Sequence, residues 1–288
     1  MHWLRIGFLM VLMTVTSAYA ADRPTLVSVG GGVTEIVYAL GAEDQLLGVD
    51  TSSTWPEAAT ELPQVGYQRT LSAEGVLSLR PQVLLASHEA GPPHVLTQLA
   101  DAGVDVVRVE GDYSFAGLLN RVETVAEAIG RETQGKALAE QLQSEWQAVQ
   151  TTVKNQSLQA EDGGALRVVV LMSHAGTPMA AGEHSGADTM LSMAGVRNAF
   201  AEQFQGYKPF SAEAMVSAAP DAIVVTRIDS SAFDIDRVIE DVPGLSLAPA
   251  GKNRRVIPVD IVRFLGFGPR LPEAVAELHK ALGLQSEH

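Results

Sequence analysis

The sequence contains no cysteine. Disulfides, thiolate metal sites and cysteine nucleophiles are therefore excluded, although a chain of 288 residues can bury enough apolar surface to fold without cross-links. Long apolar runs are also scarce. The one clear run, residues 6–15, is too short to span a bilayer, and no later stretch resembles a transmembrane segment. We therefore expect no integral membrane domain.

Residues 1–20 are typical of a secretory signal peptide. A short polar start with Arg5 precedes the apolar run, and Ala18-Tyr19-Ala20 forms a small-x-small site. We expect cleavage after Ala20. Because no cysteine follows the run, we expect no lipid-modified N-terminus, so the mature chain should be soluble and exported.

Basic residues are few, 20 against 34 acidic ones, and the net charge is −14. Removing the leader takes away Arg5, the only charged residue in it, which leaves −15. Such an acidic chain is a poor candidate for binding nucleic acid, and solubility is the simplest role for its charge. The nucleophile elbow, the H-E-x-x-H motif and the P-loop are all missing as well. We therefore expect binding rather than catalytic turnover.

One stretch is written twice. V-G-Y-Q-R-T-L-S-A-E-G-V-L-S-L-R-P-Q-V-L-L-A-S covers residues 65–87, and G-Y-K-P-F-S-A-E-A-M-V-S-A-A-P-D-A-I-V-V-T covers residues 206–226. In each copy a serine (Ser72, Ser211) precedes a short helix, a proline follows nine residues later, and a buried strand comes next. A helix–turn–strand unit repeated at this distance predicts two similar lobes with a cleft between them.

Strands and helices alternate along both halves of the chain, which predicts an α/β fold with parallel-rich sheets flanked by helices. Between the two copies, residues 131–155 show a long helical pattern of apolar residues. We therefore divide the chain into a signal peptide (1–20), an N-terminal lobe (21–130), a linking helix (131–156) and a C-terminal lobe (157–288). A stiff helix between the lobes should limit their relative motion.

Tyr67 and Arg69 are two residues apart in an extended loop, so both side chains can face one side. A guanidinium near a phenol stabilises the phenolate, and the pKa of a free tyrosine is roughly 10. Phenolate is a hard donor suited to ferric iron, and tyrosine is a known axial ligand of haem. The alternative is an ordinary surface tyrosine.

His174 follows a predicted strand, Arg167–Met172, at the end where α/β sheets bind ligands. It is a candidate metal ligand, or else a hydrogen-bonded loop residue. The residues after it, 176–182, read as a Gly/Pro loop that lines a site. A zinc site from the histidines is a weaker alternative, because their spacings fit no compact zinc motif: His88, His94, His174 and His184.

Gly30-Gly31-Gly32 separates a predicted strand, Thr25–Val29, from a helix predicted over Thr34–Leu40. A nucleotide site is an alternative here, but the third glycine of the dinucleotide fingerprint is missing. We expect the backbone N–H groups of these glycines to approach whatever fills the cleft, because a helix N-terminus favours a carboxylate.

Glu74 and Glu213 occupy equivalent positions in the two copies, each in the first turn after an N-cap serine. Acidic residues stabilise helix N-termini, which accounts for each of them separately. Their occurrence in both copies is better explained if two exposed carboxylates dock on two basic sites of a two-fold partner.

Together the leader, the G-Y-Q-R-T-L-S-A-E-G stretch, the G-P-P turn, the S-H-A-G-T-P-M-A-A-G loop and the second S-A-E unit resemble the periplasmic haem-binding proteins of bacterial haem-uptake ABC transporters. The resemblance covers almost all of the mature chain. The S-A-E units are shared with the wider siderophore and cobalamin class, whereas Gly66-Tyr67-x-Arg69 points to haem. The fold implied is that of a class III substrate-binding protein, with haem between the lobes.

The resemblance implies that Tyr67 is the proximal iron ligand and that Arg69 contacts its phenolate or a propionate. His174 matches a ligand present in only some members, and some members with it accommodate two stacked haems. Arg227 is a candidate propionate partner, and Tyr207 and Lys208 face the cleft by analogy with the first copy. Glu74 and Glu213 match acids that dock on permease arginines.

The resemblance also implies a monomeric periplasmic carrier that delivers haem to an inner-membrane permease dimer, supplied indirectly by an outer-membrane haem receptor system. A cobalamin or ferric-siderophore carrier is the rival within the same class. An exported zinc- or nucleotide-dependent enzyme is the rival from a different class.

Overall fold

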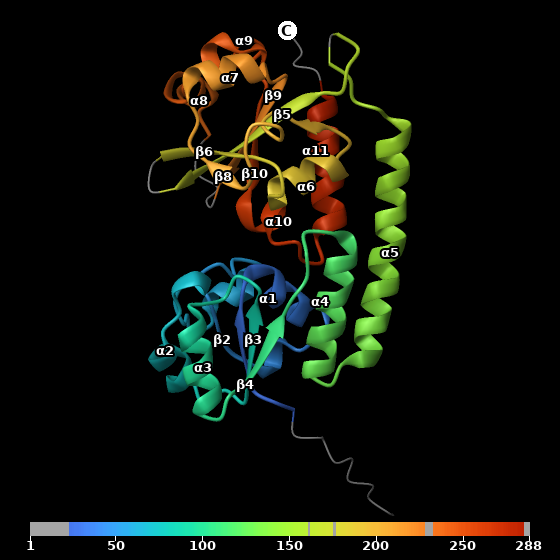
Figure 1. Ribbon diagram of the computed structural model, residues 1–288. Coiled ribbons are helices and arrows are strands. Elements are labelled where there is room, and N and C mark those ends of the chain that lie inside the picture. The colour runs from blue at the N-terminus through green and yellow to red at the C-terminus, as the bar shows by residue number, and fades with distance from the viewer. Residues whose placement is uncertain (1–22, 161, 175–176, 228–232, 285–288) are drawn as a thin grey trace, which may run out of the picture.

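The computed structural model describes residues 23–160, 162–174, 177–227 and 233–284. The chain forms two α/β lobes, one above the other in Figure 1, with the long helix α5 (Glu132–Asn155) running beside both. The expected fold class, two lobes with parallel-rich sheets joined by a long helix, is confirmed. The predicted signal peptide lies outside the described residues.

The sheet of the first lobe has four parallel strands in the order β2–β1–β3–β4. Every residue of its inner strand β3 is buried, because helices cover both faces of the sheet and the strand needs an unbroken apolar run. The strands are β1 (Leu26–Val29), β2 (Leu46–Val49), β3 (Val83–Ser87) and β4 (Asp105–Val109).

Helices cover both faces of this sheet. Val83 and Leu85 of β3 face a core shared with α1 and α4, whereas Leu84 and Ala86 face α2 and α3. The helices of this lobe are α1 (Gly31–Ala39), α2 (Ala73–Ser78), α3 (Pro93–Asp101) and α4 (Phe115–Ala128), with short 3₁₀ turns η1 (Glu43–Gln45), η2 (Glu57–Glu61) and η3 (Gln68–Thr70).

The sheet of the second lobe is mixed, in the order β10–β9–β5–β6–β8, with β7 pairing the start of β5. Strands β10, β9 and β5 pair in parallel, and β7 also pairs with β5 in parallel, while β6 and β8 are antiparallel additions. The strands are β5 (Arg167–His174), β6 (Thr177–Ala181), β7 (Arg197–Asn198), β8 (Tyr207–Lys208), β9 (Ala222–Arg227) and β10 (Val256–Asp260).

The sequence predicted a Gly/Pro loop over residues 176–182. This prediction is wrong for residues 177–181, which form strand β6. Pro178 is tolerated there because β8 pairs only with Ala180 and Ala181. At Pro178, among the described residues, β6 therefore pairs with β5 alone. A proline fits a strand where the ladder does not need its missing N–H.

Helices also cover both faces of the second sheet. Val168 and Val170 of β5 face α6 and α11, and Val169 and Leu171 face a second core closed by α7 and the α8–α9 region. The helices are α6 (Gly186–Met193), α7 (Ala212–Ala218), α8 (Ile235–Asp241), α9 (Pro249–Lys252), α10 (Ile261–Leu265) and α11 (Leu271–Gly283), with the 3₁₀ turn η4 (Leu245–Leu247).

The repeated unit of the sequence is a repeated unit of structure. Ser72 accepts a hydrogen bond from Gly75 N at 3.4 Å to begin α2, and Ser211 accepts one from Ala214 N at 3.2 Å to begin α7. Each helix leads into an inner strand of its own sheet, β3 or β9. The predicted N-caps are confirmed.

Helix α5 packs along both lobes. Leu142 is fully buried, and the ring of Trp146 stacks on Phe115 of α4 with centroids 5.1 Å apart. Helix α5 also packs against α11 of the second lobe. The helix thus braces the two lobes along one side. Among the described helices, none has the length and apolarity needed to cross a bilayer.

The lobes also touch directly between α1 and the segment that joins α10 to α11. The two backbone segments approach so closely that a Cβ on Gly32 would lie 2.2 Å from the carbonyl oxygen of Gly266. Buried Glu35 forms a two-pronged ion pair with Arg270, at 2.6 and 3.0 Å, and the Arg121 guanidinium donates to Phe267 O at 3.1 Å. The lobes therefore meet across a tightly packed, partly charged contact.

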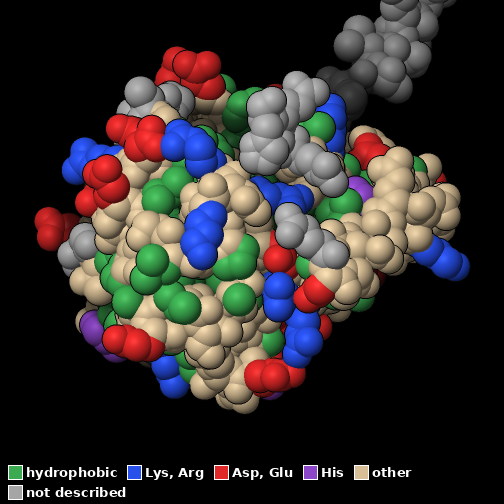
Figure 2. Space-filling view, turned by 90° about the horizontal axis from the view of Figure 1, so that it is seen from above, with side chains coloured by type: hydrophobic (Ala, Val, Ile, Leu, Met, Phe, Trp, Pro, Cys, Tyr) green, Lys and Arg blue, Asp and Glu red, His purple; other side chains and the backbone are tan. Residues whose placement is uncertain are grey.

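Charge is dispersed on the face that the second lobe presents from above. Figure 2 shows acidic and basic side chains scattered among apolar ones there, with no continuous patch of one sign. The negative net charge is thus not gathered on this face, which agrees with a general role in solubility.

Candidate functional site

The loop that carries Tyr67 and Arg69 is held firmly by its backbone. Gly66 adopts φ +101°, a conformation that favours glycine, and its carbonyl accepts from Thr51 N at 2.9 Å. Gln68 O accepts from Gly91 N at 2.8 Å, and Leu71 N donates to Gly91 O at 2.9 Å. The loop is thus tied to the segment after β2 and to the turn after β3.

Among the residues that the structure describes, Tyr67 is one of the few large hydrophobic side chains that are exposed, at 43%. It directly precedes η3, which turns the chain so that Arg69 follows within the same loop. The charge of Arg69 and the phenol of Tyr67 are near enough to interact electrostatically. The expected pair is therefore brought together, with the phenol open to a ligand.

The direct partner of Arg69 is Glu89, at 2.5 Å from Nη2 to Oε1. The same carboxylate accepts from Gln68 Nε2 at 3.2 Å and from the Tyr113 hydroxyl at 3.3 Å. Sequence reasoning missed Glu89. It lies 20 residues from Arg69, in the turn after β3, and no spacing rule connects the two.

Electrostatics separate the tyrosines of this region. Burial, helped by the Glu89 carboxylate, raises the pKa of Tyr113 to about 12. Burial also raises the pKa of Tyr207. The phenols of Tyr113 and Tyr207 therefore resist ionisation.

Arg69 shows two opposed effects. Burial lowers the pKa of its guanidinium, but the adjacent Glu89 carboxylate outweighs this and the pKa is raised. The arginine is therefore firmly charged. Its side chain keeps 57% of its surface exposed, so an added anion could still reach it.

Tyr207 and Lys208 have different surroundings. Tyr207 packs against the core, and its hydroxyl accepts from Ala187 N at 3.4 Å, whereas Lys208 is exposed. Neighbouring residues of a strand point to opposite faces, so the two side chains do not share a direction. Tyr207 is close enough to interact electrostatically with Glu89 and Arg69. This second-lobe tyrosine therefore faces the loop of the first lobe.

His174 is the last residue of β5, with Thr177 as its partner in the antiparallel ladder, and its side chain lies outside the described part of the structure. Arg227 ends β9, and its guanidinium carbon lies 5.2 Å from the centroid of the Phe233 ring. Both residues thus sit at the carboxyl ends of inner strands of the second sheet, where the sequence placed them.

The glycines after β1 do not have the predicted role. The N–H of Gly30 donates to buried Asp50 at 2.8 Å, and that of Gly31 donates to Ser52 Oγ at 3.2 Å. These donors are already used inside the protein, and Gly32 packs against Gly266 of the other lobe. Glycine is needed at these positions because other parts of the chain approach them closely. Helix α1 begins three residues earlier than expected, at Gly31.

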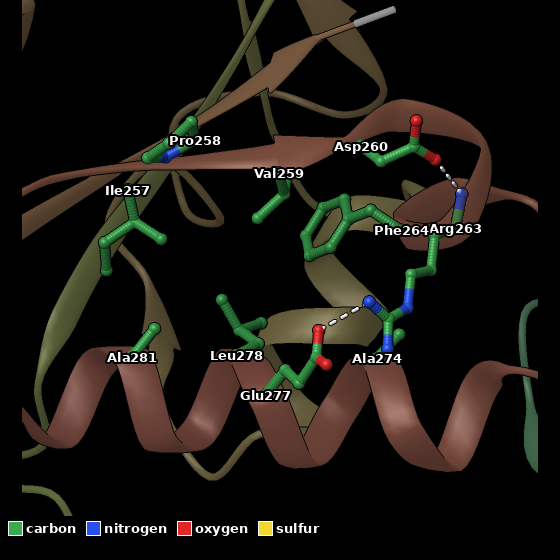
Figure 3. A pocket seen from close by; sticks show the side chains of 10 residues that line it. All are labelled: Ile257, Pro258, Val259, Asp260, Arg263, Phe264, Ala274, Glu277, Leu278 and Ala281. Carbon is green, nitrogen blue, oxygen red and sulfur yellow. Dashed lines mark hydrogen bonds and ion pairs between the residues drawn. The ribbon is translucent and has the colours of Figure 1, made fainter. Parts of the chain in front are cut away.

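Two cavities of the described chain lie elsewhere. One, of about 270 Å³, lies between β10 and α11, with Val259, Phe264 and Leu278 pointing into it and the Arg263–Glu277 ion pair, 2.7 Å long, at one end (Figure 3). The other, of about 300 Å³, lies beneath α8 and includes Phe233. Neither is lined by Tyr67 or Arg69. Within the described ranges, no three acidic or histidine side chains gather as a metal site would require.

The sequence profile of the periplasmic binding protein family matches residues 26–260. The chain belongs to this family. A substrate-binding lipoprotein of an ABC transporter, YvrC of Bacillus subtilis, is 31% identical over 89% of this chain and 79% of its own. The vitamin B12-binding protein of Yersinia pestis is 24% identical, over 85% of both chains.

Among solved structures, the periplasmic heme-binding protein BhuT in complex with two hemes superimposes with a TM-score of 0.83. It is 38% identical, and the match covers 90% of this chain and 98% of BhuT. The family membership agrees with the twin-lobed fold, and these relatives are binding proteins by name.

Proposed function

We propose that this protein is the periplasmic substrate-binding component of a haem ABC importer, and not an enzyme. The observation that carries the proposal is the exposed Tyr67 beside the charged Arg69 on a rigid loop, in a chain 38% identical to a heme-binding protein along nearly its whole length. A phenolate is a suitable axial ligand for ferric haem.

In this proposal Tyr67 binds the ferric iron, and its neighbour Arg69 interacts with the phenolate or with a propionate. Arg227 of the second lobe is a second propionate partner, since guanidinium binds carboxylate in a two-pronged geometry. His174 is a candidate for a further iron ligand. Only one of the two β8 residues can face the haem, because Tyr207 and Lys208 point to opposite faces of the strand, and Tyr207, which lies near Glu89 and Arg69, is the better candidate.

Delivery requires a partner. Glu74 and Glu213 are both exposed, at equivalent positions of α2 and α7, and their symmetry suits a two-fold permease with basic sites. We infer that the protein acts as a monomer that docks with one lobe on each half of the permease. An outer-membrane haem receptor system would supply the haem indirectly.

The proposal includes export through a cleaved signal peptide (1–20) into the periplasm. It also includes the division into an N-terminal lobe (21–130), a linking helix (131–156) and a C-terminal lobe (157–288). Support for the division comes from the two separate sheets and from α5, which packs on both lobes.

Titration of the purified protein with ferric haem tests the function. We expect a Soret band that grows to saturation at one or two equivalents, with the charge-transfer bands of a tyrosinate-bound high-spin ferric haem. Absence of a saturable spectrum would overturn the proposal.

Cobalamin is the second candidate, because of the 24% identity to the vitamin B12-binding protein. A parallel titration with cobalamin distinguishes the two. Saturable binding of cobalamin together with no haem spectrum would favour the second candidate.

A further inference from the structure

The carboxylate of Glu89 is the centre of a hydrogen-bond network on the first lobe. Three donors converge on it: the Arg69 guanidinium at 2.5 Å, the Tyr113 hydroxyl at 3.3 Å and the Gln68 amide at 3.2 Å. Gln68 is itself held by Ser87, whose hydroxyl donates to Gln68 Oε1 at 2.9 Å. The carboxylate is thus held in one place by residues of two loops.

This network pairs the Glu89 carboxylate with Arg69, which lies two residues from Tyr67. Arg69 can give its charge either to Glu89 or to an anion that arrives from outside, such as a propionate or a newly formed phenolate. A charge already paired with an internal carboxylate attracts an added anion less strongly. Glu89 therefore competes with the ligand for Arg69.

If Arg69 turned away to a ligand, the Glu89 carboxylate could keep its position. Its side chain is 26% exposed, and the Tyr113 and Gln68 donors remain, so the carboxylate would keep two hydrogen bonds. Tyr113 is fixed in turn by its ring contact with Phe267 of the second lobe, 5.1 Å between centroids. An exchange of Arg69 between Glu89 and a ligand thus needs only the rotation of one half-exposed side chain.

We propose that Glu89 is a built-in competing anion that holds Arg69 when the site is empty and speeds release of the ligand by taking the arginine back. The inference rests on the proposed function. It assigns to Glu89 a role in setting the residence time of the ligand, which a carrier must keep short enough for delivery.

The test is the rate at which ferric haem passes from the loaded full-length mature protein to excess apomyoglobin. Glu89→Gln keeps the size and hydrogen-bonding capacity of the side chain but removes the competing charge. We expect release to slow about two- to fivefold, the range of an exposed ion pair. Simple damage to the loop would instead speed release, so the direction of the change is diagnostic.

Matched variants isolate the cause. Glu110→Gln makes the same change in the Arg108–Glu110 pair, 3.0 Å long, whose arginine donates to the backbone of the same turn at His88 and Ala90. It should leave release unchanged. In an Arg69→Gln background, Glu89→Gln should have no effect, because the arginine for which it competes is gone. Glu89→Asp, which keeps the charge but retracts it, should fall between the wild type and Glu89→Gln.

Unchanged or faster release from both Glu89→Gln and Glu89→Asp would overturn the inference. So would an equal effect of Glu89→Gln with and without Arg69. Tyr67→Phe, measured alongside, tests the proposed function separately. If this variant keeps the wild-type spectrum, the ligand assignment fails. If it loses the tyrosinate spectrum as expected while the Glu89 variants release haem at the wild-type rate, only the role of Glu89 is rejected.

Discussion

Tyr67 and Tyr113 are two phenols of the first lobe in opposite surroundings. Tyr67 is exposed, while Tyr113 is half-buried and hydrogen-bonded to Glu89, and its burial, together with that carboxylate, raises its pKa to about 12. The same residue type therefore has different chemistry at the two positions. The sequence does not show directly the burial and neighbouring charge that keep Tyr113 protonated.

Tyr67→Phe should remove the tyrosinate charge-transfer bands of the ferric haem complex and weaken binding by at least tenfold, because phenylalanine has no donor atom for iron. Tyr113→Phe makes the same chemical change and should leave those bands in place. Optical spectra and haem titration of both variants check this. Equal spectra for Tyr67→Phe and the wild type would reject the assignment.

Gly66 determines the path of the loop that carries Tyr67 and Arg69 through its positive φ of +101°. Gly66→Ala should destabilise the protein by about 1–2 kcal/mol, the cost of an unfavourable backbone conformation, and should also weaken haem binding. Urea unfolding and haem titration measure the two effects.

Gly103→Ala is the matched control, since Gly103 has a φ of +91° in a turn away from the site and open space around its Cβ position. It should cost similar stability and leave haem binding intact. If both variants impaired binding equally, the loop would have no special role.

At the scale of elements, α2 and α7 are the corresponding helices of the two lobes, and each exposes a glutamate in its first turn. Changing Glu74 and Glu213 to lysine together should abolish haem import while ferric haem still binds, because repulsion replaces attraction at both docking points. Import in a reporter strain and titration of the purified protein check the two parts.

The control pair Glu140→Lys and Glu145→Lys makes the same change in net charge on exposed positions of α5. It should leave import unchanged. Import at the wild-type rate by the Glu74/Glu213 double variant would reject the docking role.

The repeated elements could be predicted from the sequence because their signals are local. An N-cap serine, a proline nine residues later and an apolar run define α2–β3 and α7–β9 without any knowledge of the rest of the chain. The β6 strand was missed for the corresponding reason. Glycine and proline near residues 176–182 suggested a loop, while the pairing with β5 and β8 that makes β6 a strand is a long-range effect.

The candidate site could be predicted only in part. Tyr67 and Arg69 are separated by one residue, so their proximity follows from the chain itself. Glu89 comes from the turn after β3, and its contact with Arg69 exists only once that turn hydrogen-bonds to the Tyr67 loop through Gly91. The glycines after β1 misled in the same way, because their close neighbour is Gly266, far along the chain.

At the scale of the whole molecule, the Glu35–Arg270 ion pair connects the lobes. Arg270 also lies over the ring of Trp55, 4.7 Å from its centroid. Arg270→Ala should destabilise the protein by about 3 kcal/mol at neutral pH, since it leaves the Glu35 carboxylate buried without a partner. Urea unfolding measures the loss.

The loss should shrink on acidification. Burial raises the pKa of Glu35 even with Arg270 present, and removal of the arginine should raise it further. A carboxyl whose pKa is higher in the folded than in the unfolded state favours folding as the pH falls through the folded value, so the deficit at about pH 5 should be smaller than at about pH 7.

Arg197→Ala, which breaks the exposed Arg197–Glu202 pair, is the control and should cost less than about 1 kcal/mol at either pH. A deficit of Arg270→Ala that grew on acidification would contradict the buried-charge explanation.

The backbone contact between Gly32 and Gly266 leaves no room for even one methyl group. The spacing of the lobes at this point is therefore fixed by main-chain atoms, which substitutions elsewhere cannot bring closer. A variant intended to hold a smaller macrocycle would therefore have to be designed by exchanging side chains, because the two halves cannot close further at this contact.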